Sequence, residues 1–288
     1  MIIDCHYHVN DTLLPTGELL ARMATAGIDK VAIMANMCGP IHVSPGMEKL
    51  GRFLLTRSAF RGLARKLYDR FTPEGDFIVP RGAVKIYKDP DNQAVFDTID
   101  QYPDKFMGWV FINPKGNNDQ VQELDKWIHH PGAIGVKAHP FWHHFAPIDL
   151  LPVAEKVAAM GKPMLLHLGY GGHGDYRPLL DAVPALKLVL AHAAFPRYSA
   201  TWKEIAGLPN VFVDLSSTAY VDEATMRGAV RALGEDRCLF GTDGPFGSRG
   251  HGGGFDPGMI KRSIMKLFPD ENVRAKLLGG NFSRLIGA

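Results

Sequence analysis

Two histidines near the start of the chain have the spacing of a metal-binding pair. His6 and His8 flank Tyr7 near the end of the first predicted strand. Side chains two positions apart on a strand point to the same side, so both imidazoles can reach one ion. A histidine that serves only packing can lie anywhere in a core, whereas parallel α/β barrels carry their catalytic groups at the carboxyl ends of strands. The pair therefore predicts a metal site at such an end.

Three more side chains that can bind metal or transfer protons end later apolar runs. His167 ends PMLLH, His192 ends LKLVLAH, and Asp243 ends CLFGTD before a Gly-Pro turn. Each alone has a structural alternative, a helix cap or a buried hydrogen-bonded group. Together with the histidine pair they indicate one site, where a divalent ion would lower the pKa of bound water to about 7. Asp243 could accept the proton of that water, and His192 could help to stabilise an oxyanion.

Further polar residues follow the predicted strands and are candidates for substrate binding. Lys137 lies near the end of the fourth strand, and His139, two residues on, should face the same way. We expect Lys137 to pair with a substrate carboxylate, with a structural ion pair as one alternative. Tyr170, Arg197 and Arg249 lie in loops that can reach over the site. A guanidinium fork suits a planar carboxylate, although a charged loop residue is more often simply solvated.

All of these residues depend on elements that repeat along the chain as short apolar runs, each followed by a stretch with helical spacing. The runs predict eight strands, at 2–7, 30–35, 106–112, 133–138, 163–168, 186–191, 210–215 and 237–242. Helices are predicted at 16–26, 92–102, 118–129, 149–160, 176–182, 197–206, 222–233 and 256–267. Strands joined by helices run parallel, and eight such units can close into a (β/α)8 (TIM) barrel of the α/β class. An open doubly wound sheet is the alternative, but the first strand is not followed by GxGxxG.

The segment from about 37 to 92 is too long for an ordinary loop and predicts an insertion after the second strand. Its run MEKLGRFLLTRSAFRGLARKLYDRF places apolar residues at helical spacing, with basic residues between them, and RGAVKIY is a candidate extra strand. We expect a helical segment that covers the barrel mouth or side. A subunit contact is the main alternative, and binding to a membrane surface is a weaker one. Residues 1–288 are otherwise taken as a single domain.

The composition excludes several classes of function. The 288 residues include 46% hydrophobic and 22% charged residues, which suits a globular protein, and the net charge is only +2. This balance gives no overall field for nucleic acid or anionic lipid, so neither is an expected partner. The expected partner is a small-molecule substrate, and a homo-oligomer is left open.

The cysteines and the N-terminal residues bear on the compartment. Cys5, Cys38 and Cys238 cannot all pair within one chain and lack CxxC spacing, which favours a reducing compartment. The chain runs directly into MIIDCHYHV without the features of a signal peptide, and its apolar runs are too short to cross a bilayer. We therefore expect a cytoplasmic protein.

The motifs DCHYH, LLHLG, LAHAA, FGTDGPF and GNFSRLIG, spread over residues 4 to 287, resemble the amidohydrolase superfamily. They are most similar to the branch that includes aminocarboxymuconate-semialdehyde decarboxylase, resorcylate decarboxylases and pyrone-dicarboxylate lactonase. The resemblance implies metal ligands at His6, His8, His167 and Asp243, with His192 beside the metal. It also raises a second alternative for Lys137, a carboxylated lysine that bridges two metals. Zinc is the expected ion and manganese the alternative.

The resemblance also implies a substrate class. We expect a metal-dependent hydrolase of a small carboxylated carbonyl compound, such as a lactone or cyclic ester, because the HLG context of His167 looks more like the hydrolytic members. The alternative is a metal-dependent, non-oxidative decarboxylase of an aromatic or enoic acid, in which Asp243 or His192 protonates the carbon. A non-enzymatic barrel with a vestigial site is a third hypothesis, which the full ligand set argues against.

Overall fold

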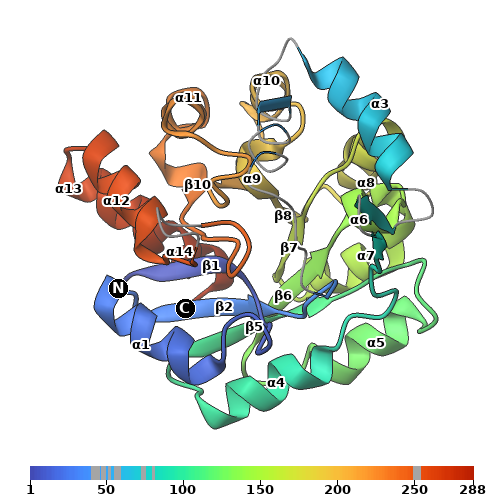
Figure 1. Cartoon of the computed structure of the whole chain (residues 1–288), viewed down its shortest axis with the longest axis horizontal. Coiled ribbons are helices and arrows are strands. Elements are labelled where there is room, and N and C mark those ends of the chain that lie inside the picture. Colours follow the sequence, from blue (N-terminus) through green and yellow to red (C-terminus); the bar gives the residue numbers. More distant parts are fainter. Residues whose placement is uncertain are drawn as a thin grey trace.

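A sheet of eight parallel strands forms the centre of the computed structural model (Figure 1), which describes residues 1–39, 46, 50, 53–54, 60–72, 76–79, 82–248 and 254–288. Neighbouring strands pair in chain order. They are β1 (Ile3–His8), β2 (Lys30–Met34), β5 (Phe106–Phe111), β6 (Ala133–Ala138), β7 (Pro163–Leu166), β8 (Lys187–Leu190), β9 (Val211–Asp214) and β10 (Cys238–Leu239). Nearly every strand residue is buried, as expected for parallel strands covered on both faces.

The last strand returns to the first and closes the sheet into a barrel. Cys5 N donates to the Phe240 carbonyl oxygen at 3.0 Å, and Tyr7 pairs with Gly244 in a parallel bridge just beyond β10. Eight parallel strands with intervening helices make a (β/α)8 barrel, so the expected fold is confirmed. In such a barrel the carboxyl ends of all strands open at one rim.

Helices surround the strands (Figure 1) and agree with the predicted ranges to within two residues at each end. They are α1 (Thr16–Ala26), α4 (Asn92–Gln101), α5 (Gln120–Trp127), α7 (Leu151–Ala159), α8 (Arg177–Ala182), α10 (Ser199–Ile205), α11 (Glu223–Leu233) and α12 (Gly258–Leu267). Asp119 and Asp222 cap α5 and α11 through their carboxylates, and Gly27 ends α1 with a φ of 61°. These residues mark where α5 and α11 begin and where α1 ends.

Several short helices were not predicted. They are α6 (Pro140–His143), α9 (Ala191–Ala194), α13 (Glu271–Ala275) and α14 (Asn281–Ile286). The first two directly follow barrel strands, and four residues are too few to show a helical period. His192 and Ala193 inside α9 have φ values of 54°, so this segment is a left-handed turn rather than a regular helix.

The insertion after β2 contains, within its described residues, helix α3 (Arg61–Phe71) and the antiparallel pair β3 (Phe77–Val79) and β4 (Gly82–Val84). The helix lies in the predicted Arg-rich run, and β4 lies in the candidate extra strand. Tyr68 of α3 packs on the rings of Phe141 and Tyr170, with centroids 4.5 and 5.4 Å apart. Both partners lie in loops that follow β6 and β7, so α3 contacts the carboxyl-end rim of the barrel. A subunit contact by this segment stays a prediction.

No helix among the described residues is long and apolar enough to cross a membrane.

Candidate active site

A cluster of three ligand-bearing side chains lies where β1 and the segment after β10 meet. The Asp243 Oδ1 atom is 3.5 Å from His6 Nε2 and 3.7 Å from His8 Nε2. These three atoms all lie within 4.8 Å of one another, close enough to hold one metal ion. His6 and His8 are buried and Asp243 is largely buried. The two histidines therefore face the same point, as their spacing on the strand predicted.

Hydrogen bonds on the far side of each imidazole fix its orientation. His6 Nδ1 lies 2.9 Å from Asp214 Oδ2, and His8 Nδ1 lies 3.0 Å from the Ala35 carbonyl oxygen. A carboxylate and a carbonyl only accept hydrogen bonds, so each Nδ1 carries the proton. The Nε2 atoms, which face Asp243, are left with their lone pairs. Metal-bound histidines usually have such a partner on the other ring nitrogen.

The electrostatics of the cluster suit a divalent cation. Burial, together with the Lys137 charge, lowers the pKa of His6 well below its usual value, and burial lowers the pKa of His8 to about 3. Both imidazoles are therefore neutral at neutral pH, as metal ligation requires. Burial raises the pKa of Asp243 to about 8, although Lys137 opposes this. A bound cation would favour the ionised carboxylate, so the three residues fit a divalent metal ion.

The loop that carries Asp243 is held against β1. Asp243 has a φ of 57°, a conformation that a non-glycine residue rarely adopts, and its amide donates to the His6 carbonyl oxygen at 2.7 Å. The buried Asp4 carboxylate accepts from the Thr242 amide at 2.9 Å and from its hydroxyl at 2.5 Å. These bonds fix Asp243 in the position from which it reaches both histidines.

Lys137 reaches the same cluster from β6. Its Nζ atom lies 3.3 Å from His6 Nε2, and its side chain is completely buried. Burial lowers the pKa of Lys137 to about 8, while the Asp214 and Asp243 carboxylates raise it. Lys137 therefore lies in the candidate site, and its pairing with a substrate carboxylate stays a prediction.

A second group of imidazoles lies beside the first. His192 Nε2 is 3.1 Å from His167 Nδ1, and the His6 and His192 rings stack with centroids 5.1 Å apart. The His139 ring lies 4.1 Å from that of His167, and its Nδ1 accepts from the Trp142 amide. His167 and His139 thus join the site, but His167 is not within the three-ligand cluster. Among the described residues, the buried Nε2 atom of His167 has no hydrogen-bond partner.

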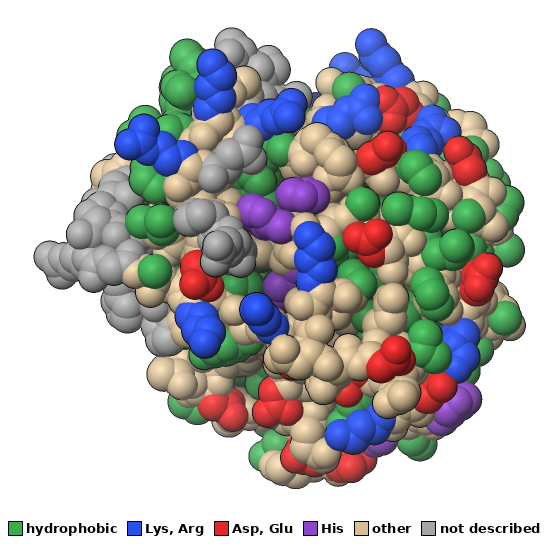
Figure 2. Space-filling view, turned by 90° about the vertical axis from the view of Figure 1, so that its right-hand side faces the viewer, with side chains coloured by type: hydrophobic (Ala, Val, Ile, Leu, Met, Phe, Trp, Pro, Cys, Tyr) green, Lys and Arg blue, Asp and Glu red, His purple; other side chains and the backbone are tan. Residues whose placement is uncertain are grey.

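Aromatic side chains surround the histidines. Tyr220 stacks on His192 with ring centroids 4.8 Å apart, and Phe141 lies 5.2 Å from His167. Phe195 contacts both Phe141 and Tyr170. Figure 2 shows histidine side chains near the middle of one face, with Lys and Arg side chains beside them, whereas His6 and His192 are fully buried below the surface. The site thus combines polar groups with flat apolar surfaces.

The structure describes only one of the two arginines that were predicted to bind substrate. Arg197 is half-exposed and pairs with Glu204 of α10, which also accepts from the Tyr176 hydroxyl. Its role in substrate binding therefore stays a prediction without a supporting contact. Arg249 lies outside the described residues.

Asp214 and Ser216 are the main residues that the sequence analysis missed. Asp214 is the last residue of β9 and is fully buried between His6 and His192. Its signal was present, because a carboxylate at the end of the apolar run NVFVD satisfies the same rule that identified Asp243. Ser216 follows two residues later, with its hydroxyl 2.9 Å from His192 Nδ1.

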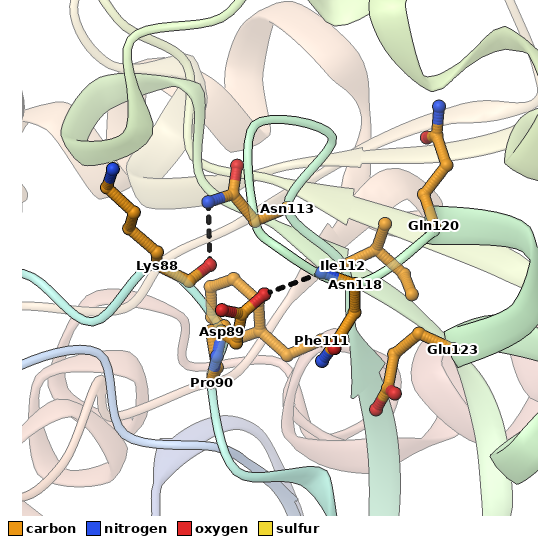
Figure 3. A pocket seen from close by; sticks show the side chains of 9 residues that line it. All are labelled: Lys88, Asp89, Pro90, Phe111, Ile112, Asn113, Asn118, Gln120 and Glu123. Atoms are coloured by element: carbon orange, nitrogen blue, oxygen red, sulfur yellow. Dashed lines mark hydrogen bonds between the residues drawn. The ribbon is translucent and has the colours of Figure 1, made fainter.

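A separate pocket lies near the end of β5 (Figure 3). It is lined by Lys88, Asp89, Pro90, Phe111, Ile112, Asn113, Asn118, Gln120 and Glu123. Asn113 Nδ2 donates to the Lys88 carbonyl oxygen, and the Asn118 amide donates to Asp89. Because the residues that line it include no histidine, cysteine or serine, the pocket is a weaker candidate than the histidine cluster.

Comparison with solved structures gives the same fold. The 5-carboxyvanillate decarboxylase from Sphingomonas paucimobilis matches with a TM-score of 0.61 and 16% identity, over 99% of this chain and 98% of that one. The 4-oxalomesaconate hydratase from Rhodopseudomonas palustris matches with a TM-score of 0.61 and 16% identity, over 100% and 96%. A dihydroxybenzoic acid decarboxylase from Polaromonas, solved with bound manganese, matches with a TM-score of 0.58 and 15% identity, over 99% and 96%.

At these identities the structures support the fold alone, and no curated protein matches the chain. The family model described as amidohydrolase, however, matches residues 3–287. This span includes both ends of the barrel and His6, His8 and Asp243 of the three-ligand cluster. The chain therefore belongs to the amidohydrolase family.

Proposed function

We propose that this protein is a metal-dependent decarboxylase of a small, flat carboxylic acid, either aromatic or enoic. The observation that carries the proposal is the convergence of His6, His8 and Asp243 at the barrel rim. Hydrolysis was the first expectation from the sequence and decarboxylation the alternative. The similar solved structures, which include decarboxylases and a hydratase, support the alternative better.

His6, His8 and Asp243 would hold the metal, and His167 is the proposed fourth ligand. Its buried Nε2 atom has no hydrogen-bond partner in the part of the chain that the structure describes, which is costly unless an ion or substrate group contacts it. When bound, a divalent ion supplies positive charge that stabilises negative charge on substrate oxygens. Zinc remains the proposed ion, and the manganese in the Polaromonas enzyme supports manganese as the alternative.

The other residues of the site suit a carboxylated, planar substrate. Lys137 supplies a buried cation beside His6. A substrate carboxylate that pairs with this ammonium group would compensate for the hydration that it loses on burial. Tyr220, which is only partly buried and stacks on His192, offers a flat surface on which an aromatic or conjugated ring can stack.

The reaction requires one proton transfer to carbon. When the bond between the substrate carbon and its carboxylate breaks, carbon dioxide leaves and the electron pair stays on the substrate carbon. Asp243, a member of the ligand cluster, or His192, whose ring stacks on that of His6, would then deliver to that carbon a proton taken up from solvent. A hydrolase would use the same carboxylate to take a proton from water instead, so the products distinguish the two reactions.

The test is metal analysis of the purified protein, followed by assays on carboxylated phenols, enoic acids and carboxylated lactones. We expect about one divalent ion per chain and release of carbon dioxide that disappears in His8→Ala. The matched control is His130→Ala, since His130, in the turn after α5, pairs with Asp100 of α4 outside the barrel and should keep full activity. Opening of lactones without carbon dioxide release would show a hydrolase, and a metal-free wild-type protein would exclude both reactions.

A further inference from the structure

The buried carboxylate of Asp214 contacts both groups of histidines. Its Oδ2 atom lies 2.9 Å from His6 Nδ1. Its Oδ1 atom accepts from the His192 amide at 3.0 Å, from the Ser216 amide at 3.0 Å and from the Ser216 hydroxyl at 2.5 Å. The side chain is fully buried, so no water competes for either oxygen. Each oxygen thus has a separate set of partners.

The partners of Oδ1 determine where the protons lie in the second group. Because the Ser216 hydroxyl donates to Asp214, its oxygen accepts from His192 Nδ1, 2.9 Å away, and the Ser216 carbonyl oxygen accepts from the same nitrogen at 3.3 Å. His192 Nε2 therefore has a lone pair and accepts from His167 Nδ1 at 3.1 Å. The proton of His167 is then on Nδ1, which leaves Nε2 as the unpartnered, buried lone pair.

The contact between Oδ2 and His6 determines where the proton of His6 lies. An ionised carboxylate oxygen only accepts, so His6 Nδ1 carries the proton and Nε2 carries the lone pair that faces Asp243. The Ser216 hydroxyl oxygen, 3.3 Å from His6 Nδ1, is a weaker second acceptor for the same proton.

We propose that Asp214 is a positioning residue that keeps His6 and His167 protonated on Nδ1, so that the Nε2 atoms of both can bind the metal. It acts directly on His6 through Oδ2 and indirectly on His167 through Oδ1, Ser216 and His192. This inference rests on the proposed metal site and not on which reaction the site performs. A carboxylate kept only for folding would not require this arrangement of protons.

The variant Asp214→Asn hardly changes the shape of the side chain. It separates the direct effect of Asp214 on His6 from its indirect effect on His167. The amide oxygen must face the His192 and Ser216 amides, because the amide NH2 there would oppose two donors. The NH2 group then faces His6 Nδ1 and donates to it. His6 must move its proton to Nε2, where it blocks metal binding, while His192 and His167 keep their tautomers.

The experiment uses the full chain labelled with ¹⁵N-histidine and stripped of metal. Long-range proton–nitrogen spectra distinguish the two tautomers, and His6→Gln, His167→Gln and His192→Gln identify the three rings by loss of their signals. In the wild type we expect Nδ1–H on all three. In Asp214→Asn we expect only His6 to change, with affinities for Zn²⁺ and Mn²⁺, measured by chelator competition, about 10- to 100-fold weaker.

The control is Asp4→Asn, which removes another buried carboxylate of the site but touches no imidazole nitrogen, so the three tautomers should stay as in the wild type. Nε2–H on any of the three wild-type rings would overturn the proposal, even if Asp214→Asn does not fold. An unchanged His6 tautomer or unchanged metal affinity in a folded Asp214→Asn protein would also overturn it. Failure of the proposed reaction would instead appear as missing turnover with the tautomers as expected.

Discussion

Asp4 in the first strand and Thr242 after the last strand are joined by two hydrogen bonds, from the threonine amide and from its hydroxyl, across 238 residues of sequence. The same carboxylate accepts from the His6 amide at 3.0 Å. The barrel has a seam where β1 meets β10 and the segment after it. The pair thus connects β1, on one side of this seam, to the loop that carries Asp243 on the other. The site depends on this seam, because its ligands come from both sides of it.

The first prediction concerns this seam. Asp4→Ala leaves the Thr242 and His6 amides buried without acceptors, which should lower the free energy of unfolding by roughly 2–4 kcal/mol. Urea denaturation followed by circular dichroism measures the change. Asp29→Ala is the control, because Asp29 also accepts an amide of the N-terminal segment, from Ile2, but at an exposed position. A similar small loss in both variants would contradict the role of Asp4.

The second prediction concerns Asp243. Asp243→Asn keeps the shape of the side chain but removes the charge of a proposed metal ligand and proton carrier. We expect kcat to fall by about 10²- to 10⁴-fold while the melting temperature of the metal-free protein stays close to that of the wild type. Asp256→Asn, which breaks an exposed pair with Arg262, should leave kcat unchanged. Normal turnover in Asp243→Asn would remove this residue from the mechanism.

The third prediction concerns the left-handed turn at His192. Positive φ values at His192, Ala193 and Ala194 are unfavourable, and the Trp202 indole donates to the Ala193 carbonyl oxygen at 2.8 Å. Trp202→Phe should lower the free energy of unfolding by about 1–3 kcal/mol and kcat by up to about 100-fold, since it displaces His192.

Trp127→Phe is the matched control for this experiment. It also loses an indole hydrogen bond, to Glu123, but on an outer helix. Steady-state kinetics and thermal denaturation of both variants measure the effects. If kcat falls equally in the two, the turn has no special link to catalysis.

The fourth prediction concerns the thiols. The three cysteines are free and buried, and burial raises the pKa of Cys38 to about 11 and that of Cys238 to about 12. At pH 8 the thiolate fraction is therefore very small, and a disulfide reagent such as DTNB should react slowly with the native protein. All three thiols should react rapidly once the chain is unfolded in guanidinium. Rapid reaction of a native thiol would show that its surroundings open.

The sequence predicted the barrel because its signal is local. Strands buried on both faces appear as short apolar runs, and the helices between them carry their own caps, such as Asp222 before α11. The positions of His6, His8 and Asp243 followed from the strand ends. The short segments α6 and α9 could not be predicted, because their conformations depend on tertiary contacts such as that between Trp202 and Ala193.

The contacts between side chains were less predictable. The proximity of Lys137 to His6, and of Asp214 to two histidines, depends on which strands become neighbours across the barrel interior. Arg197 lies after a motif strand, as a substrate-binding arginine would, but Glu204 provides a nearer partner on the following helix. Sequence position gives the rim on which a residue lies, and the side-chain partner is decided by the folded neighbours.

The seam between the first and last strands also determines when the proposed metal site is completed during synthesis. His6 and His8 leave the ribosome before the rest of the barrel, and their carboxylate partner is made only after almost all of the barrel has been translated. The nascent chain therefore carries only two of the three proposed ligands until Asp243 is added, and the proposed site is complete only on closure. A chain that stops before Asp243 should bind divalent ions weakly at best, however much of the barrel it contains.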